Sequence, residues 1–361
     1  MRRSTLWTTL GLLAIVLVAA SQPAVAQFYE QHNLISDGVV PADLVDPLVV
    51  NAWGLVAGPT SPWWISDNET GRSTIYNVTT GAEPFTVTVP GNPTGIVFNG
   101  TTGFVVDNGM GPAPARFLFA SEDGTISAWH SVAGAVPPAT VVVDSSASGA
   151  VYKGLATAST EEGEPRLYAT DFHNGKVDVF DGDFGIVEDG FKDPTIPEHY
   201  APFGIQAFGD VILVTYALQD ADALDDVPGE GHGYVNMFDT EGNFLKRVTE
   251  KGQLNSPWGL ALAPDDFGKF SGHLLVGNFG NGRIHAFDPT KLNGKGEFQH
   301  RGPLHSAEGI PVQIDGLWGL SFGNGGAAGP TNTLFFTAGP DDESHGLFGS
   351  LVAVAPPGRN R

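Results

Sequence analysis

The stretch NSPWGL, residues 255–260, decides the fold because its pattern is repeated along the chain. Each copy of the pattern has a Gly that is followed by Leu or Ile and preceded by a bulky or polar residue. The repeated glycines are separated by 41, 59, 50, 55 and 60 residues, and they are Gly54, Gly95, Gly154, Gly204, Gly259 and Gly319. A repeat of this length is typical of an array built from one supersecondary unit.

Each repeat contains the pattern of a β-hairpin. In GHLLVGNFGNGRIHAFD, residues 272–288, a β-rich segment runs into an Asn-Gly turn and then into an alternating segment. Residues 63–76, 116–129 and 166–181 follow the same plan. Alternation with period two around such a turn predicts a hairpin, and no segment after the first 26 residues sustains a helical period. Each unit is therefore expected to have four strands, a to d, with strand a at the Gly.

These units predict an all-β protein, a six-bladed β-propeller of four-stranded antiparallel blades. The last repeat ends at residues 347–354 without an outer strand, and residues 28–36 precede the first repeat. Pairing these two segments would close the ring and bury the sheet edges. Blade two is expected to carry an insertion, residues 102–115, between its first two strands.

The first 26 residues have the pattern of a signal peptide. Arg2 and Arg3 precede an apolar run at residues 10–20, and AVA at residues 24–26 offers a cleavage site. The run is shorter than the roughly 20 residues that span a bilayer. We expect a signal peptide, 1–26, and a single propeller domain, 27–361, in an exported protein, periplasmic or extracellular, without a membrane span.

Composition limits the classes of partner. The chain has no Cys, so its stability must come from a core rather than from disulfides. Without Arg2 and Arg3, the 18 basic residues become 16 against 40 acidic ones, a net charge near −24. This charge repels nucleic acid and is compatible with cationic ligands, metal ions or plain solubility. We expect a monomer that does not bind nucleic acid.

The repeat resembles a known family. Pro-x-Gly-Leu-Ala at residues 257–261, followed by a strand, Asn-Gly-Arg-Ile at 281–284 and Phe-Asp at 287–288, is similar to NHL-repeat and gluconolactonase-like six-bladed propellers. The chain after residue 26 also resembles an uncharacterised family of exported bacterial propeller proteins. The resemblance is specific for the fold and says little about activity, because one fold hosts many functions.

The residue before each repeated Gly is a candidate ligand-binding residue. Gly permits inner strands to approach closely, and its neighbour is expected at one mouth of the central channel. These neighbours are Trp53, Thr94, Lys153, Phe203, Trp258 and Trp318. Two interpretations remain: the rings plug the mouth and pack on each other, or they form a platform for a small molecule, a glycan or a protein ligand.

The turns between strands b and c are expected on the same face. The two longest are acidic, QDADALDDVPGEGH at residues 219–232 and PDDESH at residues 340–345. An acidic rim around aromatic rings would favour a cation, a metal-held substrate or a sugar. The alternative is that Asp and Asn in these turns bond their own backbone.

The resemblance also implies a candidate metal site. Gluconolactonase-like propellers hold a divalent ion on the channel axis, and in this chain the candidates are Asn51, Asp171, Glu198 and Asp315, although no spacing fixes them. Residues 219–232 do not match an EF-hand, because Asp225 stands where its Gly should be. GLSFG at residues 319–323 matches a nucleophile-elbow string but lies in an expected inner strand, so we interpret it as coincidence.

Two functions are therefore open. The first is binding of a small ligand or partner at an aromatic, acid-rimmed mouth. The alternative is a metal-dependent, lactonase-like hydrolase or lyase, with an ion such as calcium polarising a carbonyl group. A purely structural module is a third hypothesis, and the sequence does not decide whether the protein is an enzyme.

Overall fold

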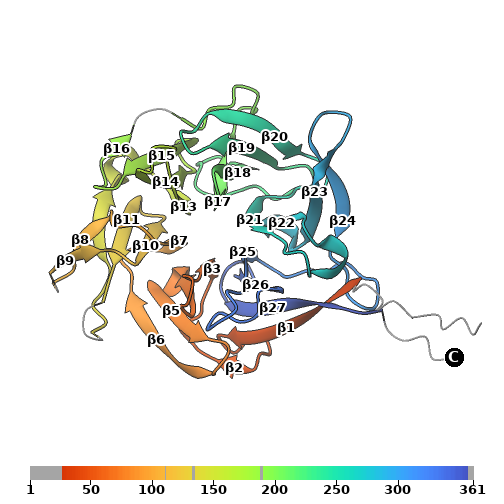
Figure 1. Cartoon of the computed structure of the whole chain (residues 1–361), viewed down its shortest axis with the longest axis horizontal. Coiled ribbons are helices and arrows are strands. Elements are labelled where there is room, and N and C mark those ends of the chain that lie inside the picture. Colours follow the sequence, from red (N-terminus) through yellow and green to blue (C-terminus); the bar gives the residue numbers. More distant parts are fainter. Residues whose placement is uncertain (1–26, 110, 132–134, 188–189, 357–361) are drawn as a thin grey trace, which may run out of the picture.

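The six-bladed propeller is confirmed. The computed structural model describes residues 27–109, 111–131, 135–187 and 190–356. These residues form six sheets arranged radially around a central axis, as Figure 1 shows. The predicted signal peptide lies outside the described residues.

The first three blades follow one another along the chain, and each runs from an inner to an outer strand. Blade one contains β3 (Ala52–Val56), β4 (Trp63–Asp67), β5 (Arg72–Asn77) and β6 (Ala82–Thr88). Blade two contains β7 (Pro93–Phe98), β10 (Phe117–Ser121), β11 (Thr125–Trp129) and β12 (Thr140–Asp144). Blade three contains β13 (Tyr152–Ser159), β14 (Pro165–Asp171), β15 (Lys176–Asp181) and β16 (Ile186–Val187).

The next two blades repeat this order, and the sixth is completed by the start of the chain. Blade four contains β17 (Tyr200–Phe208), β18 (Val211–Leu218), β19 (Tyr234–Asp239) and β20 (Phe244–Glu250). Blade five contains β21 (Pro257–Leu262), β22 (Leu274–Asn278), β23 (Ile284–Leu292) and β24 (Phe298–Pro303). Blade six contains β25 (Leu317–Phe322), β26 (Thr333–Ala338), β27 (Leu347–Val354), β1 (Phe28–Ser36) and β2 (Leu44–Val45).

The ring is closed by the predicted strand. β1 pairs antiparallel with β27, from Phe28 opposite Val354 to Ser36 opposite Leu347, and the two strands lie side by side in Figure 1. The Tyr29 hydroxyl donates a hydrogen bond to the Phe267 carbonyl at 3.1 Å, which ties the closing strand to blade five. The predicted insertion in blade two forms its own hairpin, β8 (Val105–Asp107) and β9 (Pro112–Pro114).

The repeated glycines are required because the inner strands nearly touch. A Cβ atom at Gly204 would lie 2.2 Å from the Trp258 carbonyl oxygen of the next blade. A Cβ atom at Gly54 would lie 2.3 Å from the Thr94 carbonyl oxygen. Such approaches are far inside van der Waals contact, so only Gly fits at these positions.

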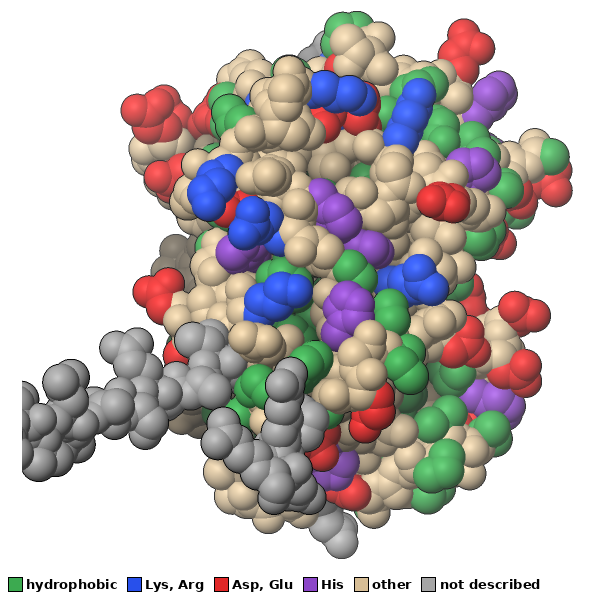
Figure 2. Space-filling view, turned by 90° about the vertical axis from the view of Figure 1, so that its right-hand side faces the viewer, with side chains coloured by type: hydrophobic (Ala, Val, Ile, Leu, Met, Phe, Trp, Pro, Cys, Tyr) green, Lys and Arg blue, Asp and Glu red, His purple; other side chains and the backbone are tan. Residues whose placement is uncertain are grey.

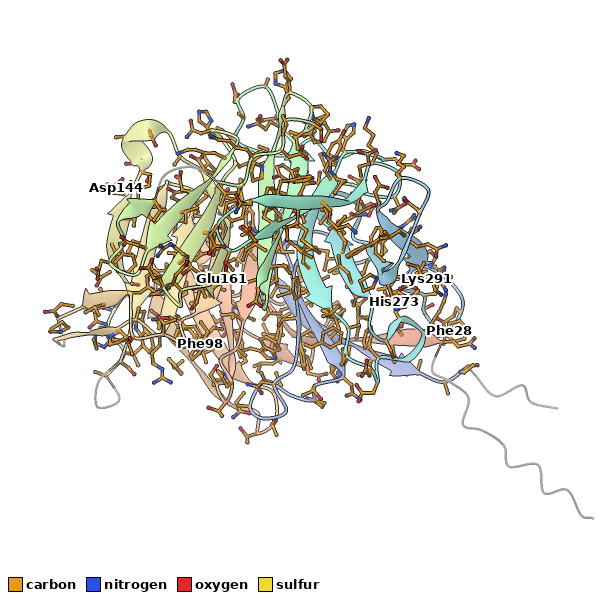
Figure 3. All side chains as sticks on the ribbon, turned by 45° about the horizontal axis from the view of Figure 1, so that its top comes forward. Phe28, Phe98, Asp144, Glu161, His273 and Lys291 are labelled. Carbon is orange, nitrogen blue, oxygen red and sulfur yellow. The ribbon has the colours of Figure 1, made fainter. Side chains whose placement is uncertain are left out.

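The core is divided among the gaps between neighbouring blades. Between blades one and two, the Trp64 ring stacks on Phe117 with centroids 3.9 Å apart. Between blades six and one, the Trp63 ring packs against Phe335 at 5.1 Å. Figure 3 shows side chains filling the space between adjacent sheets. Because every blade buries both faces against its neighbours, the ring is held by apolar packing.

The surface carries both signs of charge. On the flank shown in Figure 2, Lys, Arg and His gather toward the middle while Asp and Glu lie mostly near the rims. The helices among the described residues are short 3-10 turns, and none has the length and apolar character that a membrane crossing requires.

Candidate functional site

A buried lysine lies at the mouth of the channel where the b–c turns meet. Lys153 is near the start of inner strand β13, and its side chain is 2% exposed. Its Nζ atom lies 2.5 Å from Glu122 Oε1, in the β10–β11 turn, and 2.8 Å from Asp225 Oδ1, in the β18–β19 connection. The two carboxylates reach it from neighbouring blades on either side, so the ammonium group is paired in spite of its burial.

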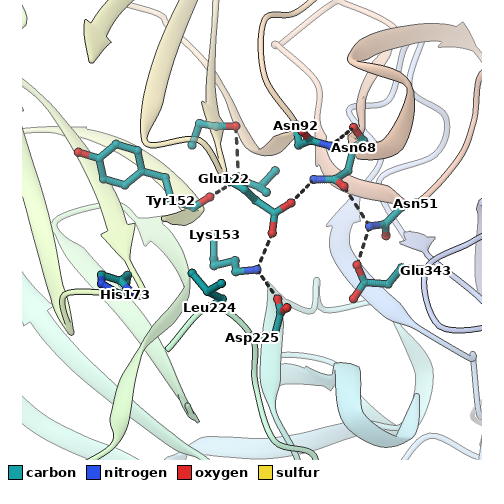
Figure 4. A network of polar contacts seen from close by, with 12 residues as sticks. Asn51, Asn68, Asn92, Glu122, Tyr152, Lys153, His173, Leu224, Asp225 and Glu343 are labelled. Carbon is teal, nitrogen blue, oxygen red and sulfur yellow. Dashed lines mark hydrogen bonds and ion pairs between the residues drawn. The ribbon is translucent and has the colours of Figure 1, made fainter. Parts of the chain in front are cut away.

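Hydrogen bonds between side-chain amides and carboxylates extend this site across blade one. Asn68 donates a hydrogen bond from Nδ2 to Glu122 Oε2 at 2.9 Å. Asn51 donates from its own Nδ2 to Asn68 Oδ1 at 3.3 Å and to Glu343 Oε2 at 2.8 Å. We call the six residues of this network, drawn in Figure 4, the mouth cluster: Asn51, Asn68, Glu122, Lys153, Asp225 and Glu343.

The turn that carries Glu343 has an unusual backbone. Three consecutive residues, Asp341, Asp342 and Glu343, have φ angles of 58°, 50° and 66° in the left-handed region. Asn51 also has a positive φ, 46°. Such conformations cost of order 1 kcal/mol or more per residue and gather at functional sites. This strain is an independent reason to regard the mouth cluster as more than a structural contact.

The charges of the mouth cluster are strongly coupled. Burial alone would lower the pKa of Lys153, but Glu122 and Asp225 together outweigh it and hold that pKa above its usual value. Burial raises the pKa of Glu343 to about 7; the Lys153 ammonium opposes this increase, and the negative charges of Glu122 and Asp225 add to it. Burial likewise raises the pKa of the neighbouring Asp226 to about 6. The site therefore holds one firmly protonated amine and two carboxyl groups that titrate close to neutral pH.

The predicted ring of residues is brought together, but it is almost entirely buried. Trp53 and Trp318 stack with centroids 3.7 Å apart, and Phe279 stacks on the other face of Trp318 at 3.9 Å. Of the six predicted residues, five are buried and only Trp258 is partly exposed. The axial arrangement matches the interpretation that the rings pack on each other, and their binding role stays a prediction.

The polar atoms of this ring mostly bond to the inner strands. The indole N–H of Trp258 donates to the Lys153 carbonyl at 3.1 Å, and that of Trp318 donates to Asn51 Oδ1 at 2.9 Å. The Thr94 hydroxyl donates to the Tyr152 carbonyl at 2.7 Å. The inner strands line a cavity of about 30 Å³, whose wall includes Trp258. This space is about that of one water molecule, so a small organic ligand would have to bind outside it.

The four metal candidates do not form a donor set. Asn51 is engaged in the mouth cluster, and both carboxylate oxygens of Asp171 accept hydrogen bonds from Asn174. Asp315 accepts a hydrogen bond from the Asp341 backbone at 3.0 Å, and Glu198 lies elsewhere, beside a cavity between blades three and four. Across the described ranges, no three His, Asp or Glu side chains gather as a metal-binding group. The residues present therefore do not fit the predicted divalent ion.

The carboxylates of the mouth cluster were missed as individual site residues. All three lie in b–c turns, which were expected on the mouth face. Asp225 and Glu343 belong to the two long acidic turns, 219–232 and 340–345, and Glu122 belongs to a shorter turn. That placement is confirmed by their contacts with Lys153 and Asn51. The turn positions were thus a usable signal, but nothing in the spacing indicates which acidic residue of each turn reaches the axis.

The fold and the mouth cluster define a six-bladed β-propeller with a charged site at one end of its channel. No known family model matches the chain. An uncharacterised protein of Acanthamoeba polyphaga mimivirus is 35% identical over 337 residues, covering 89% of this chain and 79% of the relative. A second uncharacterised protein of the same virus is 33% identical over 345 residues, covering 90% and 86%. The chain belongs to the family of these two viral proteins.

Solved structures share the architecture. A streptogramin B lyase is similar with a TM-score of 0.50 at 11% identity, over 90% of this chain and 97% of the lyase. A protein of unknown function from Bacteroides thetaiotaomicron has a TM-score of 0.55 at 11% identity, over 90% and 76%. At such identities the likeness concerns the fold alone.

Proposed function

We propose that this protein is an exported propeller that binds a small cationic ligand at the mouth cluster. The observation that carries the proposal is an imbalance of charge. One buried ammonium, on Lys153, faces Glu122, Asp225 and Glu343, with Asp226 beside them. When all four carboxyl groups are ionised, the site has an excess of three negative charges.

The carboxylates face the solvent more than the lysine does. The Asp225 side chain is 72% exposed and that of Glu122 is 28% exposed, against 2% for Lys153. A ligand arriving from solution therefore meets carboxylate oxygens first. A cationic group placed there would compensate the excess charge at short range, where partial burial limits screening by water and salt.

The proposal is tested with simple cations as probes. Calorimetric titration of the protein with tetramethylammonium, ethylammonium and calcium chlorides, at constant ionic strength, is expected to show saturable binding of at least one ammonium probe. The variant Glu343→Gln is expected to weaken it about tenfold, because one charged hydrogen-bond acceptor is lost. The control Glu161→Gln changes an exposed carboxylate in the β13–β14 turn and should bind as the parent does.

The outcomes separate the two functions. Heat that saturates with neither ammonium probe, or that is unchanged in Glu343→Gln, would overturn the proposal. Binding of calcium alone would favour the alternative, a metal-dependent hydrolase or lyase. Glycan and protein ligands remain part of the broader binding hypothesis and give no signal in this titration.

Binding of a cation should depend on pH through Glu343. Its raised pKa of about 7 means that, below this pH, a cation must displace a proton from the carboxyl group. We expect affinity to fall by up to tenfold for each pH unit below about 7 and to level off above it. In the folded protein, the raised pKa also means that stability contributed by protonated Glu343 is lost as pH rises through about 7. Calorimetric titrations from pH 5 to 9 should show the change in affinity, and denaturant unfolding over the same pH range should show the change in stability. Glu343→Gln should retain only the weaker step of Asp226 near pH 6.

A further inference from the structure

Blade five carries a local reversal of charge. Residues 267–305, which include β22, β23 and β24, contain five Lys or Arg and four of the ten His, against two carboxylates. The whole chain has 40 carboxylates against 18 Lys and Arg. The outer strands of this blade lie at the right of Figure 1 and therefore face the viewer in Figure 2, where Lys, Arg and His gather toward the middle. Blade five contributes no residue to the mouth cluster, so this basic flank is a separate feature.

Three of these side chains share one face of the blade. Arg283 precedes β23 and forms a β-bridge with Gln313, so the alternation of the strand places it on the same side as His285. His300 of β24 pairs with Phe287, which lies on that side as well. The Nδ1 atom of His285 is 3.0 Å from Nε2 of His300, and the ring centroids are 5.2 Å apart.

The positive groups around His285 act on it without a carboxylate to balance them. His285 is 6% exposed, and its pKa is lowered to about 4 by burial and then by the charges of His300, Arg283 and His305. None of the groups that shift this pKa is acidic. Arg283 is exposed and forms no ion pair with any described residue. We call Arg283, His285, His300 and His305 the blade-five cluster.

The carboxylates of this neighbourhood are engaged elsewhere. Asp288 accepts a hydrogen bond from the Thr290 hydroxyl at 2.6 Å, and Glu297 accepts one from the Asn293 amide at 2.8 Å. Glu250, on strand β20 of blade four, is paired with a lysine at 2.8 Å. Charges in solution are screened beyond about 8 Å at physiological ionic strength. The local excess of positive groups therefore matters more to a bound ion than the net negative charge of the whole chain.

The blade-five cluster suits an anion better than a metal ion. Two imidazole nitrogens at 3.0 Å are a possible pair of metal ligands, but the Arg283 guanidinium beside them repels a cation. In the part of the chain that the structure describes, no three His, Asp or Glu side chains form a metal-binding group. Guanidinium and imidazole N–H groups donate hydrogen bonds, and the oxygen atoms of sulfate and phosphate accept them.

We propose that the blade-five cluster binds a sulfate or phosphate group, either as the free ion or as an ester on a sugar. The Arg283 guanidinium would supply a permanent positive charge and two parallel N–H donors. When His285 donates its Nδ1–H to Nε2 of His300, the Nδ1–H of His300 is free to donate to the anion. His305 lies close enough to add the charge of its imidazole when it is protonated.

The test is a calorimetric titration with sodium sulfate, sodium phosphate, glucose 6-sulfate and glucose 6-phosphate, at constant pH and with sodium chloride holding the ionic strength constant. We expect saturable binding of at least one probe, and the imidazole resonances of His285 and His300 should shift at saturation in NMR spectra. Tighter binding of an ester than of its inorganic ion identifies a sugar-borne group, and the reverse identifies a free ion. Arg283→Gln should weaken binding about tenfold, because a charged bidentate donor is lost.

Arg116→Gln is the matched control. Arg116 is an exposed arginine that precedes β10 of blade two as Arg283 precedes β23, so this variant should bind as the parent does. Both variants should keep the melting temperature of the parent, since neither arginine forms an ion pair with a described residue. No saturation with any of the four probes, an unchanged affinity in Arg283→Gln, or binding of zinc chloride but of no oxyanion would each overturn this inference. None of these outcomes bears on the ammonium titration at the mouth cluster.

Discussion

Gly204→Ala is expected to lower the free energy of unfolding by about 3 kcal/mol, the upper range for overpacking a buried position. The added Cβ would lie 2.2 Å from the Trp258 carbonyl oxygen, and the Thr215 hydroxyl oxygen is 3.0 Å away on another side. A backbone carbonyl cannot rotate aside like a flexible side chain, so the inner strands of blades four and five must separate. Denaturant unfolding monitored by tryptophan fluorescence measures this change.

Gly294 supplies the matched control. It lies in the β23–β24 turn, and an added Cβ would meet nothing within 4 Å. Gly294→Ala should therefore change stability by no more than about 0.5 kcal/mol. If the denaturant midpoints of Gly204→Ala and Gly294→Ala are equal, the inner strands can separate at little cost. That result would contradict the claim that their close approach requires Gly at position 204.

Glu122→Gln is expected to have the largest effect at the mouth cluster. The substitution leaves the buried Lys153 ammonium with Asp225, which is well exposed, as its remaining ion-pair partner. Breaking a fully buried pair costs 3–5 kcal/mol. Because Glu122 is partly exposed, we expect a loss of about 2 kcal/mol in the free energy of unfolding, together with at least tenfold weaker binding of the ammonium probe.

Asp225→Asn distinguishes this role from a general loss of negative charge. Like Glu122→Gln, it removes one negatively charged partner of Lys153, but this partner is a side chain that is 72% exposed. Its stability should fall by less than about 1 kcal/mol, while probe binding should still weaken. If Asp225→Asn destabilises the fold as much as Glu122→Gln does, the different burial of the two carboxylates does not determine how much each contributes to the free energy of unfolding.

The architecture could be predicted because its signals are local. A Gly next to Leu or Ile marks each inner strand, and an Asn-Gly or Asp-Gly turn marks each hairpin. The missing outer strand of the last unit, together with an unassigned β-rich start, predicted the closure by β1 that the structure confirms. Each of these features follows from backbone geometry within a few tens of residues.

The site could be predicted only in part. Lys153 was singled out because it precedes a repeated Gly, and the acidic turns were expected on its face. The exposure of the aromatic residues was not predictable, since the stack of Trp53 on Trp318 depends on how far the rings reach across the axis. Glu198 was grouped with Asn51 as a metal candidate, yet it lies away from the mouth cluster, beside the cavity between blades three and four.

The sequence by itself determined the number of blades, the closure of the ring and the acidic character of the turns at one mouth, because period and composition are properties of short segments. Only the tertiary structure decided which carboxylates meet Lys153. Glu122 is 31 residues away from it along the chain and Asp225 is 72 residues away, and they converge because three blades place their turns around one axis. A contact of that kind depends on the angle between sheets and on side-chain reach, which no pattern in the chain encodes locally.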